Sequence, residues 1–433
     1  MEYTLGKQIA KGKTKGIFAV EGRDDLVIVR NGSDITAHDD PSFTQKFGSK
    51  AQCATITTCR VFELLRTCDV PVAYVEQISE TEFVALRSLM LLLEIVARRL
   101  GVGSFLMRNP QLRTADPTKP YRFHRLLVEF FLKTTGRDWK GLSLPCDDPL
   151  ILDPFKDTWD LALPKKPIWH EEGEGESRHR VSPFAKIPAS GVITDLADMA
   201  KLDQLVRRVS LILERAWANF GLTWLDIKIE ADSELRVSDV VDNDSWRLWE
   251  NGKPLDKQVF RDGGAAVLGQ VEENYRYVAQ MAERLVLPRQ ALVVWLGSDK
   301  DEAPKVPQLP GVTVERIVAS GHKSPVEGLQ RLERLFYDYP QGGVIVVKAG
   351  RSNGLGPIVA AHSPWPVISV PATLEQFPDD LWSSVHLPSQ TPNLTTWPEG
   401  NAIGAAMQIL GQTNPAVYAF DQMRREELDN YMG

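Results

Sequence analysis

Four short apolar runs near the C-terminus constrain the fold of this chain more than any other feature. Segments of loop or helix length separate these runs, which cover residues 292–296, 312–318, 343–347 and 367–370. Nearly continuous apolar runs are typical of parallel strands that helices cover on both faces. We therefore predict a three-layer α/β/α, doubly wound domain over residues 291–433. Ligands of such sheets bind at the carboxyl ends of the strands.

The part of the chain before residue 291 mixes strands and helices without this regular alternation. Residues 26–29 predict a buried strand, and apolar side chains recur at helical spacing over about 51–65. Further patterns predict a helix over about 195–220, a hairpin of strands 225–229 and 235–241, and a helix over about 270–285. We predict an α+β domain over residues 1–262, followed by a helix and linker over 263–290.

Residues 139–189 show no regular pattern. Seven prolines lie between Pro145 and Pro188, and an acidic run occupies residues 171–176. Proline removes a backbone donor and is disfavoured inside helices and central strands. We therefore predict a long surface insertion or a mobile loop here.

The composition argues against several classes of protein. A formal net charge of −7 without a long Lys/Arg block argues against a nucleic-acid partner. The four cysteines, Cys53, Cys59, Cys68 and Cys146, show no CxxC spacing, which argues against a zinc site or a disulfide framework. The apolar run at 89–96 is too short to span a bilayer, and the N-terminus lacks a signal-peptide pattern. We expect a cytoplasmic protein that acts on small molecules.

Residues 11–15 read Lys-Gly-Lys-Thr-Lys. Glycine lets the backbone approach a ligand closely, and three lysines could bind a polyphosphate. A basic β-turn on a solvated surface is the simpler interpretation when this segment is considered alone.

A second cluster of charged residues lies on the predicted hairpin. Alternation along a strand places Asp226, Lys228 and Glu230 on one face, and Asp239 could lie opposite Glu230. Two carboxylates there would form an oxygen site of the kind that Mg²⁺ uses while it bridges nucleotide phosphates. The alternative interpretation is a polar outer face of an ordinary hairpin.

Several of these segments together resemble known enzymes. Residues 11–15, Arg-Arg-Leu-Gly-Val-Gly-Ser-Phe at 98–105, Asp-Ile-Lys-Ile-Glu at 226–230 and Val-Val-Asp-Asn-Asp-Ser-Trp-Arg-Leu-Trp at 240–249 resemble SAICAR synthetase. Ala-Gly-Arg-Ser-Asn-Gly-Leu-Gly-Pro at 349–357 resembles the animal-type AIR carboxylase. The order is that of the bifunctional SAICAR synthetase/AIR carboxylase family of purine biosynthesis. The resemblance implies an ATP-grasp-like fold for the N-terminal domain and assembly as a homo-oligomer.

For the N-terminal domain, the resemblance implies an ATP-dependent ligase. It would activate the carboxylate of CAIR as an acyl phosphate, which the amine of aspartate captures as an amide, with ATP and Mg²⁺ bound together. The residues implied to bind ATP are Lys11, Gly12, Lys13, Lys15, Lys133, Glu230 and Asp239, of which Glu230 and Asp239 would also bind Mg²⁺. Those implied to bind substrate are Lys50, Arg98, Ser104, Arg108, Asp226, Ser245 and Lys257, and those implied in catalysis are Lys228, Asp242 and Arg247.

For the C-terminal domain, the resemblance implies carboxylation of AIR. Ser298 and Asp301 would meet the ribose phosphate, and His322 and Lys323 would face the imidazole and CO₂. Histidine can move a proton near neutral pH, and lysine can offset a carboxylate charge. The remaining residues implied to bind substrate are Ser320, Gly350, Arg351, Ser352, Asn353 and Gly354.

The chain also departs from the pattern of this family. Thr55-Ile56 and Met107 stand where the family has Asn-Lys and a basic residue, and only Asp138 follows Lys133 as a candidate for the family's acidic cluster. Three prolines, Pro304, Pro307 and Pro310, stand where the first helix of the carboxylase fold should run. Two alternatives therefore stay open: a ligase of this fold that uses another carboxylate and amine in specialised metabolism, or a degenerate scaffold paralogue with an inactive carboxylase domain.

Overall fold

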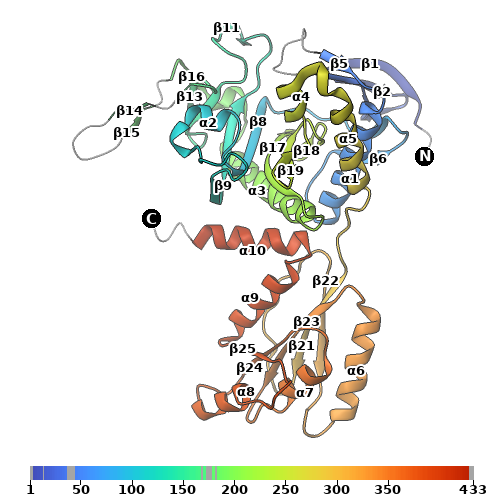
Figure 1. Ribbon diagram of the computed structural model, residues 1–433, viewed down its shortest axis with the longest axis vertical. Helices are drawn as coiled ribbons and strands as arrows, with labels where there is room; N and C mark the ends of the chain where they lie inside the picture. The colour runs from blue at the N-terminus through green and yellow to red at the C-terminus, as the bar shows by residue number, and fades with distance from the viewer. Residues whose placement is uncertain are drawn as a thin grey trace. The chain divides into compact units, whose positions relative to one another are not determined.

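The computed structural model (Figure 1) describes residues 3–12, 14–36, 44–166, 169–171, 178–180 and 183–428. The chain divides into two compact units, Met1–Leu285 and Val286–Gly433. The first unit contains several sheets and the second unit one, and each unit has its own buried apolar core. None of the described helices is both long enough and apolar enough to cross a membrane.

The first unit begins with a five-stranded antiparallel sheet. Its strands, in the order β1-β2-β3-β7-β6, are β1 (Leu5–Lys11), β2 (Lys15–Val20), β3 (Arg23–Asn31), β7 (Glu82–Leu86) and β6 (Tyr74–Gln77). The short pair β4 (Asp34–Thr36) and β5 (Thr44–Lys46) follows β3, and helix α1 covers Lys50–Thr67. The strand predicted at residues 26–29 and the helix predicted over about 51–65 are confirmed as parts of β3 and α1. Ile28 and Val61 are both almost fully buried.

A larger sheet of nine strands forms the middle of the first unit. Its members are β16 (Ala185–Pro188), β13 (Thr158–Ala162), β12 (Leu150–Leu152), β9 (Arg122–Leu132), β8 (Leu93–Leu100), β17 (Thr223–Ala231), β19 (Trp246–Glu250), β20 (Lys253–Pro254) and β18 (Val237–Ser238), which pairs with β17. Helix α3 (Ala197–Ala218) packs on strands β8, β9 and β17 of this sheet. Smaller elements of this unit are α2 (Ser104–Arg108), η2 (Pro110–Leu112), η3 (Ala189–Gly191), β10 (Asp138–Trp139), β11 (Leu142–Ser143), β14 (Trp169–Glu171) and β15 (Arg178–Arg180).

The prediction of an irregular insertion over residues 139–189 is wrong for much of that segment. Strands β12, β13 and β16 extend the nine-stranded sheet, and the side chains of Trp159 and Leu161 are fully buried. Among the described prolines, Pro149 stands just before β12 and Pro188 is the last residue of β16, so the ladder is kept. The acidic run lies mostly outside the described residues.

Helix α5 (Leu268–Ala282), expected to belong to a linker segment, packs instead inside the first unit. It follows α4 (Gln258–Gly263) and η4 (Gly264–Val267) and lies against α1. Its buried side chains Val271, Tyr275 and Ala279 share an apolar cluster with Phe47 and Cys53. This helix therefore belongs to the core of the first unit.

The register of the β17–β18 hairpin differs from the expected one by one residue. Ser238, not Asp239, lies opposite Glu230. Asp239 follows β18 with a φ of 71°, a left-handed conformation that turns the chain out of the ladder.

The second unit is a three-layer α/β/α domain, as predicted. Its parallel strands, in the order β22-β21-β23-β24-β25, are β22 (Val312–Val318), β21 (Gln290–Leu296), β23 (Gly343–Ala349), β24 (Val367–Pro371) and β25 (Leu394–Thr395). One apolar cluster joins this sheet to α6 (Pro325–Asp338) and α7 (Leu355–His362), and another joins it to α9 (Glu399–Leu410) and α10 (Pro415–Leu428). The short helices η5 (Pro378–Leu381) and α8 (Trp382–Val385) complete the unit. The described segment 297–311 forms no helix, as its prolines predicted.

Candidate functional site

Lysines from the start of the chain meet acids of the β17–β18 hairpin in the first unit. Lys15, at the start of β2, pairs with Asp239, and Lys133, just after β9, pairs with Glu230. Three segments far apart in the sequence thus bring four of the predicted ATP-binding residues together. Gly12 makes the turn before Lys15, because its N–H donates to the carbonyl oxygen of Lys15 at 2.9 Å.

The other lysines of the basic segment are placed differently. Lys11 is solvent-exposed at the end of β1, and Lys13 lies outside the described residues. Burial lowers the pKa of the Lys15 ammonium to about 8, although Glu230 opposes this effect. A lysine whose ammonium form is disfavoured gains most from a new anionic neighbour such as a phosphate.

Lys228 extends this charged cluster along β17. Its Nζ lies 2.6 Å from Glu94 Oε1 on β8 and 3.7 Å from Glu230 Oε1. Burial alone would lower the pKa of Lys228, but these two carboxylates outweigh burial and raise it. Lys228 is therefore held as a cation beside the predicted metal-binding carboxylate.

Two acids in this region were not found from the sequence, because a hairpin separates them from Lys133. Strands β10 and β11 pair with each other, so that Asp147 and Asp148 return to Thr134. Asp148 Oδ1 accepts the Thr134 N–H at 2.9 Å, and Asp147 Oδ1 accepts the Arg137 N–H at 2.6 Å. Burial and Glu94 raise the pKa of Asp148 to about 6.

Asp138, the acid that the sequence offered at this place, is exposed on the hairpin, where its Oδ1 accepts the N–H of Gly141 at 3.3 Å. Among the residues that the structure describes, no contact of Asp138 with Lys133 or Glu230 supports that expectation. The adjacent acids Asp147 and Asp148, before Pro149, were the acidic pair to consider in the sequence. Their return to Thr134 could be predicted only together with the β10–β11 hairpin.

The carboxylates of Glu230 and Asp239 fit a divalent cation that phosphates also bind. Within the described residues, no three His, Cys, Asp or Glu side chains gather as an all-protein metal site would require. Magnesium ions commonly use only one or two carboxylates, with the remaining ligands from phosphates and water. Asp239 Oδ1 pairs with the Lys15 ammonium, and an ionised carboxylate has further lone pairs that a metal ion can use.

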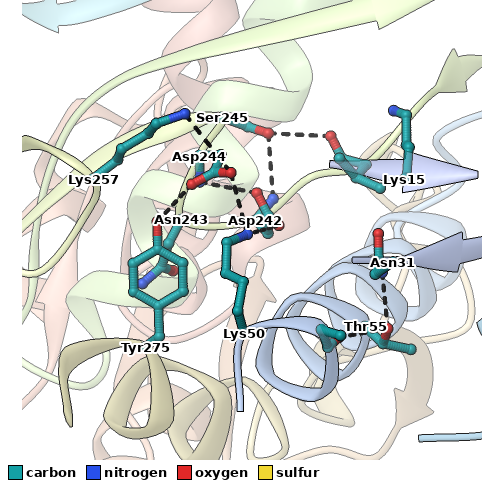
Figure 2. A network of polar contacts seen from close by, with 12 residues as sticks. Lys15, Asn31, Lys50, Thr55, Asp242, Asn243, Asp244, Ser245, Lys257 and Tyr275 are labelled. Atoms are coloured by element: carbon teal, nitrogen blue, oxygen red, sulfur yellow. Dashed lines mark hydrogen bonds and ion pairs between the residues drawn. The ribbon is translucent and has the colours of Figure 1, made fainter. Parts of the chain in front are cut away.

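A second polar cluster surrounds Lys50 at the N-terminal end of α1 (Figure 2). Lys50 Nζ lies 3.1 Å from Asp244 Oδ2 and 3.7 Å from Asp242 Oδ2, and Lys257 Nζ lies 3.9 Å from Asp244 Oδ2. The Tyr275 hydroxyl donates to Asp244 Oδ1 at 2.5 Å. Lys50 and Asp242 are almost completely buried, whereas Asp244 and Lys257 each keep 15% of their side-chain surface exposed.

These contacts shift the pKa values of the Asp242 and Asp244 carboxyls in opposite directions. Burial alone would raise the pKa of Asp244, but Lys50, Lys257 and the Tyr275 hydroxyl hold it below its ordinary value. Burial raises the pKa of Asp242 despite Lys50. Ser245 supports the same turn: its hydroxyl accepts the Asp242 N–H at 3.3 Å and donates to the Val240 carbonyl at 3.1 Å.

The departure at Thr55-Ile56 also has a structural account. Thr55 is fully buried, accepts a hydrogen bond from Asn31 Nδ2 at 2.8 Å and donates to the Ala51 carbonyl at 2.8 Å. Ile56 packs against the apolar cluster that α1 shares with α5. Both residues thus serve the packing of α1 in this chain.

Three predicted substrate-binding residues instead form a buried ion-pair network with Glu129, in which Arg98, Asp226 and Glu129 lie on strands of the nine-stranded sheet. Arg98 donates to Glu129 Oε2 at 2.7 Å and to Asp226 Oδ2 at 2.5 Å, and Arg108 also pairs with Glu129. The side chains of Arg98, Arg108 and Asp226 keep at most 3% of their surface exposed. The prediction of direct substrate contact by these three is therefore not supported, because their charges are already satisfied internally.

Arg247 is the accessible end of this network. It donates to Asp226 Oδ2 at 2.6 Å and keeps 20% of its side-chain surface exposed. A Cβ on Gly103 would lie only 2.5 Å from the guanidinium of Arg247, so the loop before Ser104 closes directly over this arginine. The loop that carries Ser104 thus lies next to Arg247.

In the second unit, the predicted residues lie in three loops at the carboxyl ends of adjacent strands. Ser298 and Asp301 follow β21, Ser320 to Lys323 follow β22, and Gly350 to Gly354 follow β23. A Cβ on Gly354 would lie 2.5 Å from His322 Nε2, so the loops after β22 and β23 touch at this histidine. Both His322 and Lys323 are exposed to solvent.

The loop after β23 is held by the segment around η5 and α8. Asn353 is buried, its N–H donates to Ser383 Oγ at 2.9 Å, and its Nδ2 donates to Ser384 Oγ at 3.1 Å. Arg351 lies 4.1 Å above the Phe377 ring and 3.7 Å from Asp380. Asn353 thus stabilises the loop after β23. Arg351, which was predicted to bind substrate, is an exposed cation of the same loop.

Comparison with known proteins finds two family models along the chain. The SAICAR synthetase model matches residues 8–140 and 182–282, and the AIR carboxylase model matches residues 293–430. The unmatched residues between 140 and 182 lie inside the segment that the sequence predicted as an insertion.

Several relatives match over nearly the whole chain. The "Probable multifunctional protein ADE2" of Caenorhabditis elegans is 32% identical over 95% of this chain and 91% of that protein. The bifunctional phosphoribosylaminoimidazole carboxylase/phosphoribosylaminoimidazole succinocarboxamide synthetase of Homo sapiens is 31% identical over 96% of this chain and 92% of that protein. The solved phosphoribosylaminoimidazole-succinocarboxamide synthase of Ehrlichia chaffeensis matches 65% of this chain and 99% of its own, with a TM-score of 0.48 and 20% identity.

Proposed function

Since the chain belongs to the bifunctional SAICAR synthetase/AIR carboxylase family of purine biosynthesis, we propose that its first unit joins CAIR to aspartate at the expense of ATP. The observation that carries this proposal is the meeting of Lys15 and Lys133 with Asp239 and Glu230. Two cations and two hard oxygen donors at one place suit a nucleotide triphosphate and its divalent ion.

The reaction we propose has two steps. A carboxylate oxygen of CAIR attacks the γ-phosphorus of ATP, which releases ADP and leaves an acyl phosphate. The amine of aspartate then attacks the acyl carbon, phosphate leaves, and the nitrogen loses one proton to give the amide. Each step brings two anionic molecules together, so catalysis depends mainly on positioning and charge neutralisation.

The first cluster is proposed to hold the nucleotide. Lys15 and Lys133 would contact its phosphates, and Glu230 and Asp239 would hold Mg²⁺. When bound, Mg²⁺ supplies positive charge that neutralises the triphosphate. Lys228, kept protonated by Glu94 and Glu230, would stand beside the transferred phosphoryl group.

The second cluster and Arg247 are proposed to hold the imidazole substrate. Lys257, Ser245 and Arg247 keep part of their side chains exposed. An arginine offers a bidentate fork to a phosphate or carboxylate. Lys50 and Asp242, buried behind them, would orient these groups without touching the substrate.

The second unit is proposed to carboxylate AIR. The carbon that attacks CO₂ must then lose a proton, which His322 would accept while Lys323 would offset the new carboxylate charge. The contact between His322 and Gly354 supports a site that the loops after β22 and β23 build together.

A homo-oligomer in a reducing compartment such as the cytoplasm completes the proposal. Exposed apolar side chains lie on α8, on β25 and in the segment after it, namely Trp382, Val385, Leu394 and Trp397, together with Phe377 just before η5. Surfaces of this kind commonly mark contacts with another chain. All four cysteines are free thiols, which suits a reducing environment.

The first activity is tested by release of ADP from ATP·Mg²⁺ in the presence of CAIR and aspartate. We expect turnover only when all three substrates are present, and a loss on the order of 10- to 100-fold for Lys133→Met, because a charge-assisted contact is removed. Lys156→Met is the matched control, since Lys156 forms an exposed pair with Asp153. Turnover with another carboxylate but not with CAIR would reject the proposed substrate, and failure to bind ATP·Mg²⁺ would reject the ligase.

A further inference from the structure

Tyr275 on α5 contacts the cluster around Lys50 but was not among the predicted site residues. Its hydroxyl donates to Asp244 Oδ1 at 2.5 Å, and Lys50 Nζ lies 5.2 Å from the centroid of its ring. The side chain is only 2% exposed. Figure 2 shows the ring between α5 and the turn that carries Asp244, with Lys50 beside it.

The hydrogen bond from Tyr275 divides the Asp244 carboxylate into two ends. Oδ1 is held by the hydroxyl, while Oδ2 lies 3.1 Å from Lys50 Nζ and 3.9 Å from Lys257 Nζ. A carboxylate held at one oxygen cannot rotate freely. Lys50 and Lys257 therefore both lie near Asp244 Oδ2, and the positions of their ammonium groups depend on the Tyr275 hydroxyl, which holds Oδ1.

Contacts at the start of α1 fix the helix that carries Tyr275. Ser49, the residue before Lys50, donates to Glu272 Oε1 at 2.6 Å and accepts from Arg276 Nε at 3.2 Å. Glu272 and Arg276 also pair with each other at 2.8 Å. Glu272 and Arg276, on either side of Tyr275 along α5, thus both contact Ser49, the residue next to Lys50. These contacts fix the distance between α1 and α5 close to the Lys50 cluster.

From this geometry we propose that Tyr275 is a positioning residue of the ligase site, acting through Asp244 on Lys50 and Lys257 and thereby on the affinity for the anionic imidazole substrate. The inference rests on the proposed function, in which Lys257 and its neighbours hold that substrate. It also makes α5 part of the site, although this helix lies beyond the segment that the sequence assigned to the ligase domain.

The proposed role predicts an effect on one substrate and not on another. Without the hydroxyl, Asp244 loses a charge-assisted hydrogen bond and its carboxylate can turn, so the two lysines lose their common anchor. Within the described residues, no hydrogen bond or ion pair links Tyr275 directly to Lys15, Lys133 or Glu230. The nucleotide end of the site should therefore keep its geometry.

The test compares Tyr275→Phe with Tyr277→Phe in the full-length chain. Tyr277 lies on the same helix and its hydroxyl also donates to a carboxylate, Glu250 Oε1 at 2.8 Å, but this pair is not part of the cluster. For Tyr275→Phe we expect the KM for CAIR to rise about tenfold, as for the loss of one charge-assisted hydrogen bond, while the KM for ATP stays within about twofold. Tyr277→Phe should keep the wild-type values. An unchanged KM for CAIR in Tyr275→Phe would overturn the inference.

A double-mutant cycle separates positioning from a general loss of structure. Asp244→Asn should raise the KM for CAIR in the same direction, and adding Tyr275→Phe to it should change the KM by less than about twofold, because the hydroxyl acts through the carboxylate. Additive effects, or equal losses for all substrates that follow the thermal melting of the variants, would contradict the proposal. If the wild type releases no ADP with CAIR and aspartate, the proposed function itself fails, and the inference falls with it. If the wild type is active and Tyr275→Phe matches it, only the inference fails.

Discussion

Gly354 lies so close to His322 that no side chain fits between them. The same is true one loop earlier, where a Cβ on Gly321 would lie 2.8 Å from the Cα of Leu355. The loops after β22 and β23 therefore approach each other through two glycines. Gly321 leaves room for this contact with the first residue of α7.

Replacing Gly354 with alanine should displace His322 and impair the second activity. The added Cβ would come within 2.5 Å of Nε2, and the exposed imidazole would move to relieve the contact. Because a shift of about 1 Å at a reacting group can cost on the order of 100-fold in rate, we expect carboxylation of AIR to fall by about 10- to 100-fold, with ligase activity unchanged. Gly400→Ala on α9 is the control, since nothing lies within 4 Å of its added Cβ. Equal carboxylase rates in both variants would show that His322 does not need its present place.

The pKa of Lys15 predicts how nucleotide binding depends on pH. In the free protein burial lowers this pKa to about 8, and bound phosphates would raise it again. Below about pH 8 the ammonium is protonated in both states, so affinity should be flat. Above it, binding must take up a proton, and the Kd for ATP·Mg²⁺ should rise with pH by up to about tenfold per pH unit.

Isothermal titration in two buffers of different ionisation enthalpy measures this proton uptake directly. Lys15→Met should bind ATP more weakly at pH 7.5 and should show no such uptake. A wild-type affinity that stays constant from pH 7 to 9.5 would contradict the assigned role of Lys15.

Elements with a strong pattern of their own were predictable from the sequence, and elements that depend on their neighbours were not. Helix α3 carries a long apolar face, and β21 and β23 are continuous apolar runs, so their existence and type were clear. Strands β12 and β16 have only three and four residues, and pairing with β9 and β13 holds them in the sheet. Such strands are formed by the ladder rather than by propensity.

The same reasoning explains which parts of the site were missed. Charged residues in dense motifs, such as Glu230 and Asp242, were recognised because their spacing is local. Asp148 was missed because the β10–β11 hairpin separates it from Lys133, and Tyr275 because a helix from further along the chain brings it in. Arg98 and Asp226 were assigned to substrate because a sequence does not show that two buried charges satisfy each other.

The β10–β11 hairpin carries a prediction about stability. It places Asp148 beside Glu94, and burial with this neighbour raises the pKa of Asp148 to about 6. A carboxyl whose pKa is raised by folding destabilises the fold once it ionises, so the penalty is absent below about pH 4 and fully present above about pH 6. Asp148→Asn keeps the oxygen that accepts the Thr134 N–H and should raise stability by about 1 kcal/mol at pH 7.5, allowing for partial exposure.

Chemical denaturation at pH 7.5 and at pH 4 checks this expectation. The stabilisation should disappear at the lower pH. Asp138→Asn, on the exposed part of the same hairpin, should change stability little at either pH. A stabilisation of Asp148→Asn that does not depend on pH would assign the effect to packing instead of charge.

At the scale of the whole molecule, two activities share one chain whose units have separate cores. The first unit ends at Leu285, after α5, and the apolar clusters of the second unit use only residues of that unit. The match to SAICAR synthetase also extends through α5, to residue 282. The boundary between the units therefore lies after this helix, not before it at residue 262.

Two truncations test this boundary. Residues 1–285 expressed alone should fold cooperatively and keep the ligase kcat of the full chain within about twofold, because every residue proposed for that reaction lies in the first unit. Residues 1–262 would lose Val271, Tyr275 and Ala279 from the cluster on α1. Burial of a large apolar side chain is worth about 1.5–3 kcal/mol, so this loss is comparable to the lower end of the stability of a typical domain, about 5–15 kcal/mol. The shorter fragment should therefore be insoluble or inactive. A soluble 1–262 fragment with full ligase activity would show that α5 is a linker after all, and would remove Tyr275 from the site at the same time.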